Sequence, residues 1–138
     1  MESKIPVILL CTALYGGQAF AACDTNTALD AAAISTAFSG QAVSFNCIND
    51  CESWMGDTLV DWHERHQGSG SGSLTEIGTG SDGIQPSKDV GSWAVAGNRI
   101  SYTYTGDGTY SYTVHPIGGS SYEFCLGGTT HKATGTID

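Results

Sequence analysis

The feature that most constrains the fold is an alternation of large and small side chains that runs through the second half of the chain, from Ser92 to Leu126. Within each run a large apolar or aromatic residue stands at every second position, with mostly Ser, Thr or Ala between. These residues are Trp93, Val95, Ile100, Tyr102, Tyr104, Tyr110, Tyr112, Val114, Tyr122, Phe124 and Leu126. Successive side chains of a β-strand point to opposite faces, so this pattern predicts strands with one buried face.

Turn-forming residues interrupt the alternation at Gly97-Asn98, at Gly106 to Gly108, at Pro116 to Ser120 and at Gly127-Gly128. The turn lengths predict the cross-strand pairs Trp93–Tyr102 and Val95–Ile100, then Tyr102–Tyr112 and Ile100–Val114, then Tyr112–Phe124 and Val114–Tyr122. Every pair sets apolar against apolar, whereas a slip of one residue would set a tyrosine against a serine. We therefore predict an antiparallel meander, which a last strand from Ala133 to Ile137 extends.

The inner face of this meander is unusually rich in tyrosine. A buried tyrosine needs a partner for its hydroxyl, so a dry core would use Phe, Leu or Val at several of these positions. Three interpretations stay open: a half-buried core whose hydroxyls reach the rim or the backbone, a pocket for a small apolar or sugar-like ligand, and a self-association surface. The candidate ligand-binding residues are Trp93, Tyr102, Tyr104, Tyr110, Tyr112 and Tyr122.

The first half of the chain adds a helix and further strands. Residues 27–38 have a helical apolar stripe, with Asn26 or Thr27 as cap and Gly40 after the end. Residues 41–47 alternate as a strand. Residues 57–67 fit a helix or a strand, and we favour the strand because residues 68–72 then form a hairpin loop into a strand over 73–77.

The N-terminus has the order of a secretory signal peptide, with a Lys, an apolar run from Ile5 to Tyr15 and small residues before Cys23. We expect residues 1–22 to be the signal peptide and residues 23–138 to form a single β-rich domain. The location would then be secreted or periplasmic. Phe20 to Cys23 can also be read as a lipobox, in which Cys23 would carry a lipid.

Cysteine parity favours disulfides over the lipid. Removing the leader removes Cys11 and leaves an even set, Cys23, Cys47, Cys51 and Cys125. Four cysteines allow three pairings, which the sequence does not distinguish. Because Cys47 and Cys51 stand close together, we expect each of them to bond to a distant partner, one to Cys23 and the other to Cys125.

Charge excludes one class of partner. The chain has 14 Asp and Glu against 5 Lys and Arg, a net charge of -9. Neutralising phosphates needs clustered Lys and Arg, so we expect no nucleic-acid partner. After the leader no stretch is long and apolar enough to span a membrane, so the expected partners are a small-molecule ligand or a second copy of the chain.

Candidate catalytic and metal-binding groups are sparse, and we expect no cofactor. His63 and His66 would share a face on a helix and could hold Zn²⁺ with a third ligand, but on a strand they point apart. Residues 78–84 resemble one turn of a calcium-binding repeat, although a single copy lacks the neighbours that such repeats stack on. Residues 68–72 match the letters of the Gly-x-Ser-x-Gly motif, but no helix follows them, so we read them as a loop. Asp61 and Glu64 form an acidic pair, but the sequence does not fix the distance between their carboxyl groups. We read His115 and His131 as surface residues.

The stretch from Trp62 to Phe124 resembles a group of small secreted bacterial proteins without an assigned activity. The shared segments are Trp62-His63-Glu64 to His66, Pro86-Ser87-Lys88, Val90-Gly91-Ser92-Trp93 and Tyr122-Glu123-Phe124-Cys125. More remotely, Gly91-Ser92-Trp93 followed by up-and-down strands is similar to lipocalin-like small barrels. There the Gly-x-Trp opens the barrel and here it lies in mid-chain, so the resemblance implies architecture alone.

Together these observations predict an α+β domain in which a short N-terminal helix packs on an antiparallel β-meander, either a curved sheet or a small open barrel, with two disulfides. The function we expect is a non-catalytic binding module that uses the tyrosine-rich face. The alternatives are a self-assembling extracellular subunit that adds β-strands between copies and a metal-dependent enzyme at His63 and His66.

Overall fold

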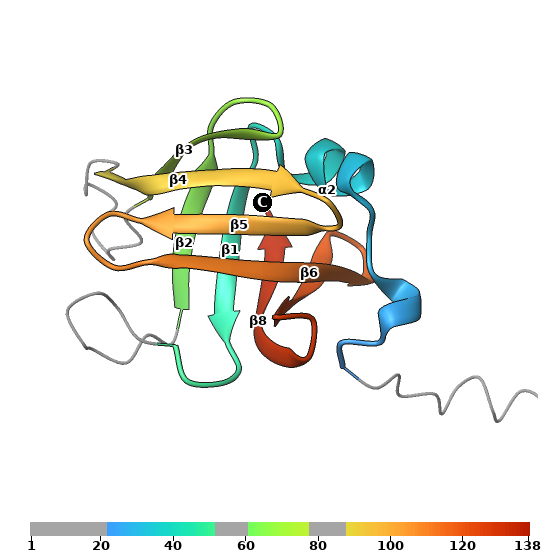
Figure 1. The fold of residues 1–138 in the computed structure, drawn as a ribbon. Helices are drawn as coiled ribbons and strands as arrows, with labels where there is room; N and C mark the ends of the chain where they lie inside the picture. The colour runs from blue at the N-terminus through green and yellow to red at the C-terminus, as the bar shows by residue number, and fades with distance from the viewer. Residues whose placement is uncertain (1–21, 52–60, 78–87) are drawn as a thin grey trace, which may run out of the picture.

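The fold is a closed eight-stranded β-barrel with a short helix near one end (Figure 1). The computed structural model describes residues 22–51, 61–77 and 88–138. The elements are η1 (Thr25–Thr27), α2 (Ala31–Phe38), β1 (Ala42–Cys47), β2 (Asp61–His66), β3 (Ser71–Glu76), β4 (Lys88–Ala96), β5 (Arg99–Tyr104), β6 (Thr109–Gly118), β7 (Ser121–Leu126) and β8 (Thr130–Ile137). Each strand pairs antiparallel with the next, and β8 pairs with β1. The predicted helix on a barrel-like meander is confirmed.

Closure removes the free edges on which the self-assembly alternative depended. Each of the eight described strands has a paired neighbour on both sides, so β-strand addition between copies has no edge strand to add to in this part of the chain. At the closing seam, Phe45 lies opposite Gly135. A methyl group on Gly135 would come within 2.6 Å of the Phe124 ring, so this glycine makes room for the aromatic core.

The N-terminal helix is shorter than predicted because two aspartates divide the segment. The Asp24 side chain accepts from the Asn26 N–H and starts η1, and the Asp30 side chain accepts from the Ala33 N–H and starts α2. Asn26 and Thr27, the predicted caps, are not the caps. The apolar side of α2 is fully buried through Ile34 and Phe38, which belong to the barrel core.

The predicted faces are confirmed throughout the meander, but two of the three predicted registers are wrong by two residues. The β4–β5 hairpin pairs Trp93 with Tyr102 as predicted. In the β5–β6 hairpin Tyr102 pairs with Tyr110, because the Tyr104 N–H bonds to the Gly108 carbonyl and the turn takes five residues, 104–108. A shift of two leaves every side chain on its face.

The β6–β7 hairpin shows the same kind of shift. Val114 pairs with Phe124 rather than with Tyr122, and a bulge lies between Pro116 and Gly118. The proline has no N–H to donate to the ladder, which favours a bulge there. Strand β6 continues to Gly118, which pairs with Ser121 across a tighter turn than the predicted loop.

The predicted disulfide pairing is wrong, although the two predicted disulfides are present. Cys23 bonds to Cys125 and Cys47 bonds to Cys51. Asp50 has a φ of 47°, and the N–H groups of residues 48 and 49 bond to the Lys132 carbonyl at 2.9 and 3.2 Å. This turn brings Cys51 back to Cys47, while the Sγ atom of Cys23, the site of the alternative lipid, is occupied by its bond to Cys125.

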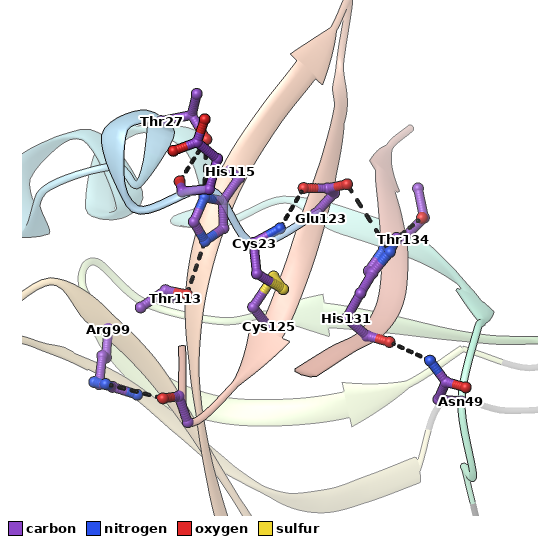
Figure 2. The surroundings of a disulfide bond; sticks show 12 residues. Cys23, Thr27, Asn49, Arg99, Thr113, His115, Glu123, Cys125, His131 and Thr134 are labelled. Carbon is purple, nitrogen blue, oxygen red and sulfur yellow. Dashed lines mark hydrogen bonds and ion pairs between the residues drawn. A yellow bond between two sulfur atoms is a disulfide. The ribbon is translucent and has the colours of Figure 1, made fainter. Parts of the chain in front are cut away.

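The N-terminal segment is held against the outside of β6 and β7 by the disulfide and a set of polar contacts (Figure 2). The Cys23 N–H donates to the Glu123 carboxylate at 3.3 Å. His115 lies between Thr27, at 3.0 Å from Nδ1, and Thr113, at 2.8 Å from Nε2. His115 is therefore buried under this segment, contrary to the surface position expected from sequence.

Candidate ligand-binding site

The barrel has two chemically different ends. The helix α2 lies near one of them, where Phe38 packs edge-on against Tyr122 and Phe124 at centroid distances of 5.1 and 5.5 Å. At the other end, where β1, β3, β5 and β7 finish, the barrel holds a cavity of about 880 Å³. An eight-stranded barrel of this kind has room for side chains or for one small ligand, and the volume falls within the range of ligand pockets.

Aromatic rings form much of the cavity wall. They belong to Phe45, Trp62, Tyr102, Tyr104, Tyr110, Tyr112 and Phe124. Phe45 and Trp62 are stacked, with centroids 5.0 Å apart and an angle of 13° between the ring planes. Phe45 also packs edge-on against Phe124 at 5.0 Å. These ring contacts fix part of the aromatic cavity wall in place.

Four of the six candidate ligand-binding residues line the cavity, and two do not. Tyr102, Tyr104, Tyr110 and Tyr112 are among the lining residues. Trp93 is buried away from the cavity, where its indole N–H donates to the Gln67 carbonyl at 2.7 Å. Tyr122 packs on Phe38 near α2.

Tyr102 belongs to both the core and the cavity wall. Its ring is 2 % exposed and its hydroxyl lies 2.8 Å from Nε2 of His66. Nδ1 of His66 lies 3.4 Å from the Gln41 carbonyl. A neutral imidazole with its proton on Nδ1 donates to Gln41 and accepts from Tyr102, which satisfies all three groups. Burial lowers the pKa of His66 to about 4, consistent with this neutral form.

Glu64 is the buried acid of the cavity. It lies on the inner face of β2, is 2 % exposed, and accepts from the Tyr104 hydroxyl at 3.0 Å on one carboxylate oxygen and 3.3 Å on the other. Burial raises the pKa of Glu64 to about 7, against the opposing effect of hydrogen bonds from Tyr104 and Trp62, and nearby Glu76 raises it further. Among the described residues Glu64 forms no ion pair.

The remaining cavity tyrosines differ in their hydroxyl partners. The Tyr110 hydroxyl donates to the Asp107 carboxylate at 3.0 Å near the mouth. Tyr112 is half-buried and its ring packs against Tyr102 at 5.8 Å. Within the described segments no hydrogen bond satisfies the Tyr112 hydroxyl, and burial raises its pKa. Tyr112 is thus the cavity tyrosine with the most polar capacity left for a ligand.

The charged lining residues are predominantly acidic. They are Asp50, Glu64, Glu76, Asp89 and Asp107 on the acidic side and Lys88 and Lys132 on the basic side. Most of them stand where strands end or begin at the open end of the barrel. A wall of low polarity with a rim of one dominant sign focuses the electric field into the cavity.

The metal interpretation needed a helix at residues 61–66, and this segment is strand β2. His63 lies on the outer face beside Asp138, to which its Nε2 is bonded, whereas His66 lies inside the barrel. Over the described ranges no three metal-binding side chains come together. Asp61 and Glu64 also lie on opposite faces, since Asp61 is exposed and bonded to Asn46. The calcium-like segment 78–84 lies outside the described residues.

Sequence reasoning considered Glu64 only as half of an acidic pair with Asp61, and it did not single out Trp62 and Phe45 as site residues. The signal was present, because Trp62, Glu64 and His66 alternate on the inner face of the predicted strand. A carboxylate at an inner position between two aromatic positions is costly to bury, and such a cost points to a functional group.

Comparisons with protein-family models, with curated proteins and with solved structures returned no match. The eight-stranded antiparallel barrel is therefore the level at which the chain is classified. In the described part of the chain, no helix is both long and apolar enough to cross a membrane.

Proposed function

We propose that this protein is a non-catalytic binding module that takes one small ligand into the open end of its barrel. The observation that carries the proposal is the aromatic cavity of about 880 Å³ opposite the helix end. A cavity of this size in so small a domain gives up core packing that would otherwise stabilise the fold. Binding a ligand is a reason to keep it.

The lining favours a ligand with a flat or apolar body. Faces of Trp and Tyr rings bury large areas against apolar groups and against the C–H faces of sugars, while their polar ends remain available for hydrogen bonds. Tyr112 and Glu64 supply such polar points within the wall. We also propose a secreted or periplasmic location, which two disulfides support because they persist in oxidising compartments.

Titration with Nile red, a neutral apolar dye, tests the proposal. We expect saturable binding of one dye per chain and an affinity about 10-fold weaker in Tyr112→Ala, because one aromatic contact is removed. Tyr112 is chosen over Tyr102, whose hydroxyl holds the core histidine. Circular dichroism confirms that the variant is folded.

Ile117→Ala is the matched control, since Ile117 is an exposed apolar side chain, 52 % accessible, at the far end of β6. This variant should bind the dye as the unaltered chain does. Equal affinities for all three proteins, or loss of binding in the control alone, would place the dye on the outer surface and reject the cavity as the binding site.

A further inference from the structure

We propose that the cavity selects an organic cation, a ligand with an aromatic or apolar body and an ammonium group that Glu64 holds. This inference rests on the proposed function and names its ligand class. It follows from the partners of one carboxylate, the rings beside it and the charge of the cavity rim.

The first observation is that the Glu64 carboxylate has unused acceptor capacity in a buried place. Two oxygens offer about four acceptor positions, and the Tyr104 hydroxyl, with its single proton, lies 3.0 and 3.3 Å from them. The Trp62 side chain also contributes a hydrogen bond. Since no described cation pairs with Glu64, its negative charge is balanced by neutral donors alone, which is costly at 2 % exposure.

The second observation is that aromatic rings lie next to this carboxylate, one on the same strand and one across the barrel. Trp62 precedes it by two positions on the same face of β2, and Tyr104 contacts it from β5 across the barrel. The rings of Tyr102 and Tyr104 are stacked with centroids 6.3 Å apart. Electron-rich ring faces attract a cation, so a carboxylate set among them suits an ammonium group whose remaining surface is apolar.

The third observation is the charge of the entrance. The lining carries five carboxyl groups and two ammonium groups, and the chain as a whole has a net charge of -9. This field draws cations towards the cavity and repels anions. A neutral ligand would gain no affinity from this field and would leave the Glu64 carboxylate without a cation beside it.

Cation binding would also displace a proton. The pKa of Glu64 is raised to about 7, and a bound ammonium group would favour the ionised form and lower it. The groups that face this carboxyl are His66 on its own strand, Glu76 on β3, Tyr102 and Tyr104 on β5 and Tyr112 on β6. Near pH 6, where Glu64 is mostly protonated, binding should release about one proton.

The test compares phenethylamine with phenethyl alcohol, which have the same body and differ in the ammonium group. The amine stays protonated near neutral pH, as a lysine does. For the unaltered protein at about pH 8 we expect the amine to bind roughly 10- to 100-fold more tightly than the alcohol. Glu64→Gln should remove most of this preference, because the amide keeps the size of the side chain and removes its charge.

Asp61→Asn is the matched control, because it removes an exposed carboxyl from the outer face of the same strand β2, where Asp61 is bonded to Asn46 and does not line the cavity. It should keep most of the preference for the amine. Proton release, measured on the unaltered protein by calorimetry in buffers of different protonation enthalpy, tests the inference independently of how the variant folds.

The outcomes separate the inference from the proposed function. Equal affinity for amine and alcohol, a preference that Glu64→Gln does not reduce, or amine binding near pH 6 without proton release would each overturn the cation inference. Binding of the alcohol and of Nile red in the cavity would then leave the proposed function standing. If neither probe nor the dye binds, both fail.

Discussion

The stability of the barrel should depend on pH through Glu64, and Glu64→Gln isolates this dependence. The pKa of Glu64 is raised from 4.5 to about 7 in the folded protein. The folded chain therefore keeps this proton over a pH range in which the unfolded chain has lost it. The contribution is fully present below about pH 4.5 and is lost as the pH rises through 7, so the group destabilises the fold at alkaline pH.

The magnitude follows from the two pKa values. A tenfold change in proton affinity corresponds to about 1.36 kcal/mol, so moving the pKa from 4.5 to about 7 makes the ionised carboxyl cost about 3 kcal/mol above pH 7. Between about pH 5 and pH 8 the unaltered protein should lose about 2 to 3 kcal/mol of unfolding free energy from this group. Glutamine does not titrate, and its carbonyl still accepts from Tyr104.

Urea unfolding at about pH 5 and pH 8 measures the effect as a difference between the two proteins. Between these pH values the unfolding free energy of the unaltered protein should fall by about 2 to 3 kcal/mol more than that of Glu64→Gln. Changes in other titrating groups, His66 among them, occur in both proteins and cancel in the difference. Asp61→Asn, which removes an exposed carboxyl from the outer face of the same strand, serves as the control. Parallel pH profiles for Glu64→Gln and the unaltered chain would refute the reasoning that burial sets the Glu64 pKa.

Three further predictions concern the scaffold. Gly91→Ala should cost roughly 2 to 4 kcal/mol of unfolding free energy in the same urea assay, because its methyl carbon would lie 1.9 Å from a backbone carbonyl oxygen of β5. Gly108→Ala should be nearly neutral, because the atom nearest to its methyl carbon would be 3.9 Å away. Replacing Cys23 and Cys125 by serine should cost about 4 to 5 kcal/mol of unfolding free energy in the chain-entropy model, since this disulfide spans 102 residues. Replacing Cys47 and Cys51 should cost about 2 kcal/mol, since this disulfide spans only 4 residues. The pKa of His66 falls from 6.5 to about 4 on folding. The contribution of His66 to the unfolding free energy is therefore fully present above pH 6.5 and is lost as the pH falls towards 4. His66→Gln should flatten the acid side of the stability profile. Equal costs for the two glycines, equal costs for the two disulfides or an unchanged acid limb would contradict the respective accounts.

The sequence predicted faces better than it predicted register, for a physical reason. Which side of the sheet a residue occupies depends on its parity in the strand, and burial enforces parity strongly. Register depends on how many residues a turn uses, and the turn from Tyr104 to Gly108 is closed by two backbone hydrogen bonds whose position the alternation does not specify. Both errors were shifts of two residues, the smallest shift that leaves the buried face intact.

The disulfide pairing was out of reach for a related reason. Proximity in sequence led us to favour a distant partner for each of Cys47 and Cys51, yet the tight turn at Asp50 brings their Cα atoms to 5.9 Å. That turn is fixed by hydrogen bonds to the Lys132 carbonyl on β8. A contact between the first and last strands exists only after the barrel has closed, so local sequence carries no sign of it.

Whether a tyrosine is core or cavity wall was equally undetermined by the alternation, because it depends on position along the barrel axis. Tyr102 and Tyr112 share the inner face, but the Tyr102 hydroxyl is bonded to His66, whereas Tyr112 has none of its hydroxyl capacity used by the described residues. The histidine on β2 distinguishes them, and the alternation does not show which tyrosine it contacts. The polar residues of β2 were the better guide, since each inner polar group needed a partner in the barrel.

These inner residues of β2 link binding to stability. Glu64 and His66 stand two positions apart on one face, and burial shifts their pKa values in opposite senses, to about 7 and about 4. Glu64 destabilises the fold on the alkaline side and His66 on the acid side, so from these two groups the barrel should be most stable between the two ordinary values, 4.5 and 6.5. A cation bound at Glu64 would offset the alkaline loss and leave the acid limb unchanged. The thermal stabilisation by phenethylamine should therefore be larger at about pH 8 than at about pH 5, and stabilisation that does not change with pH would separate the ligand from Glu64.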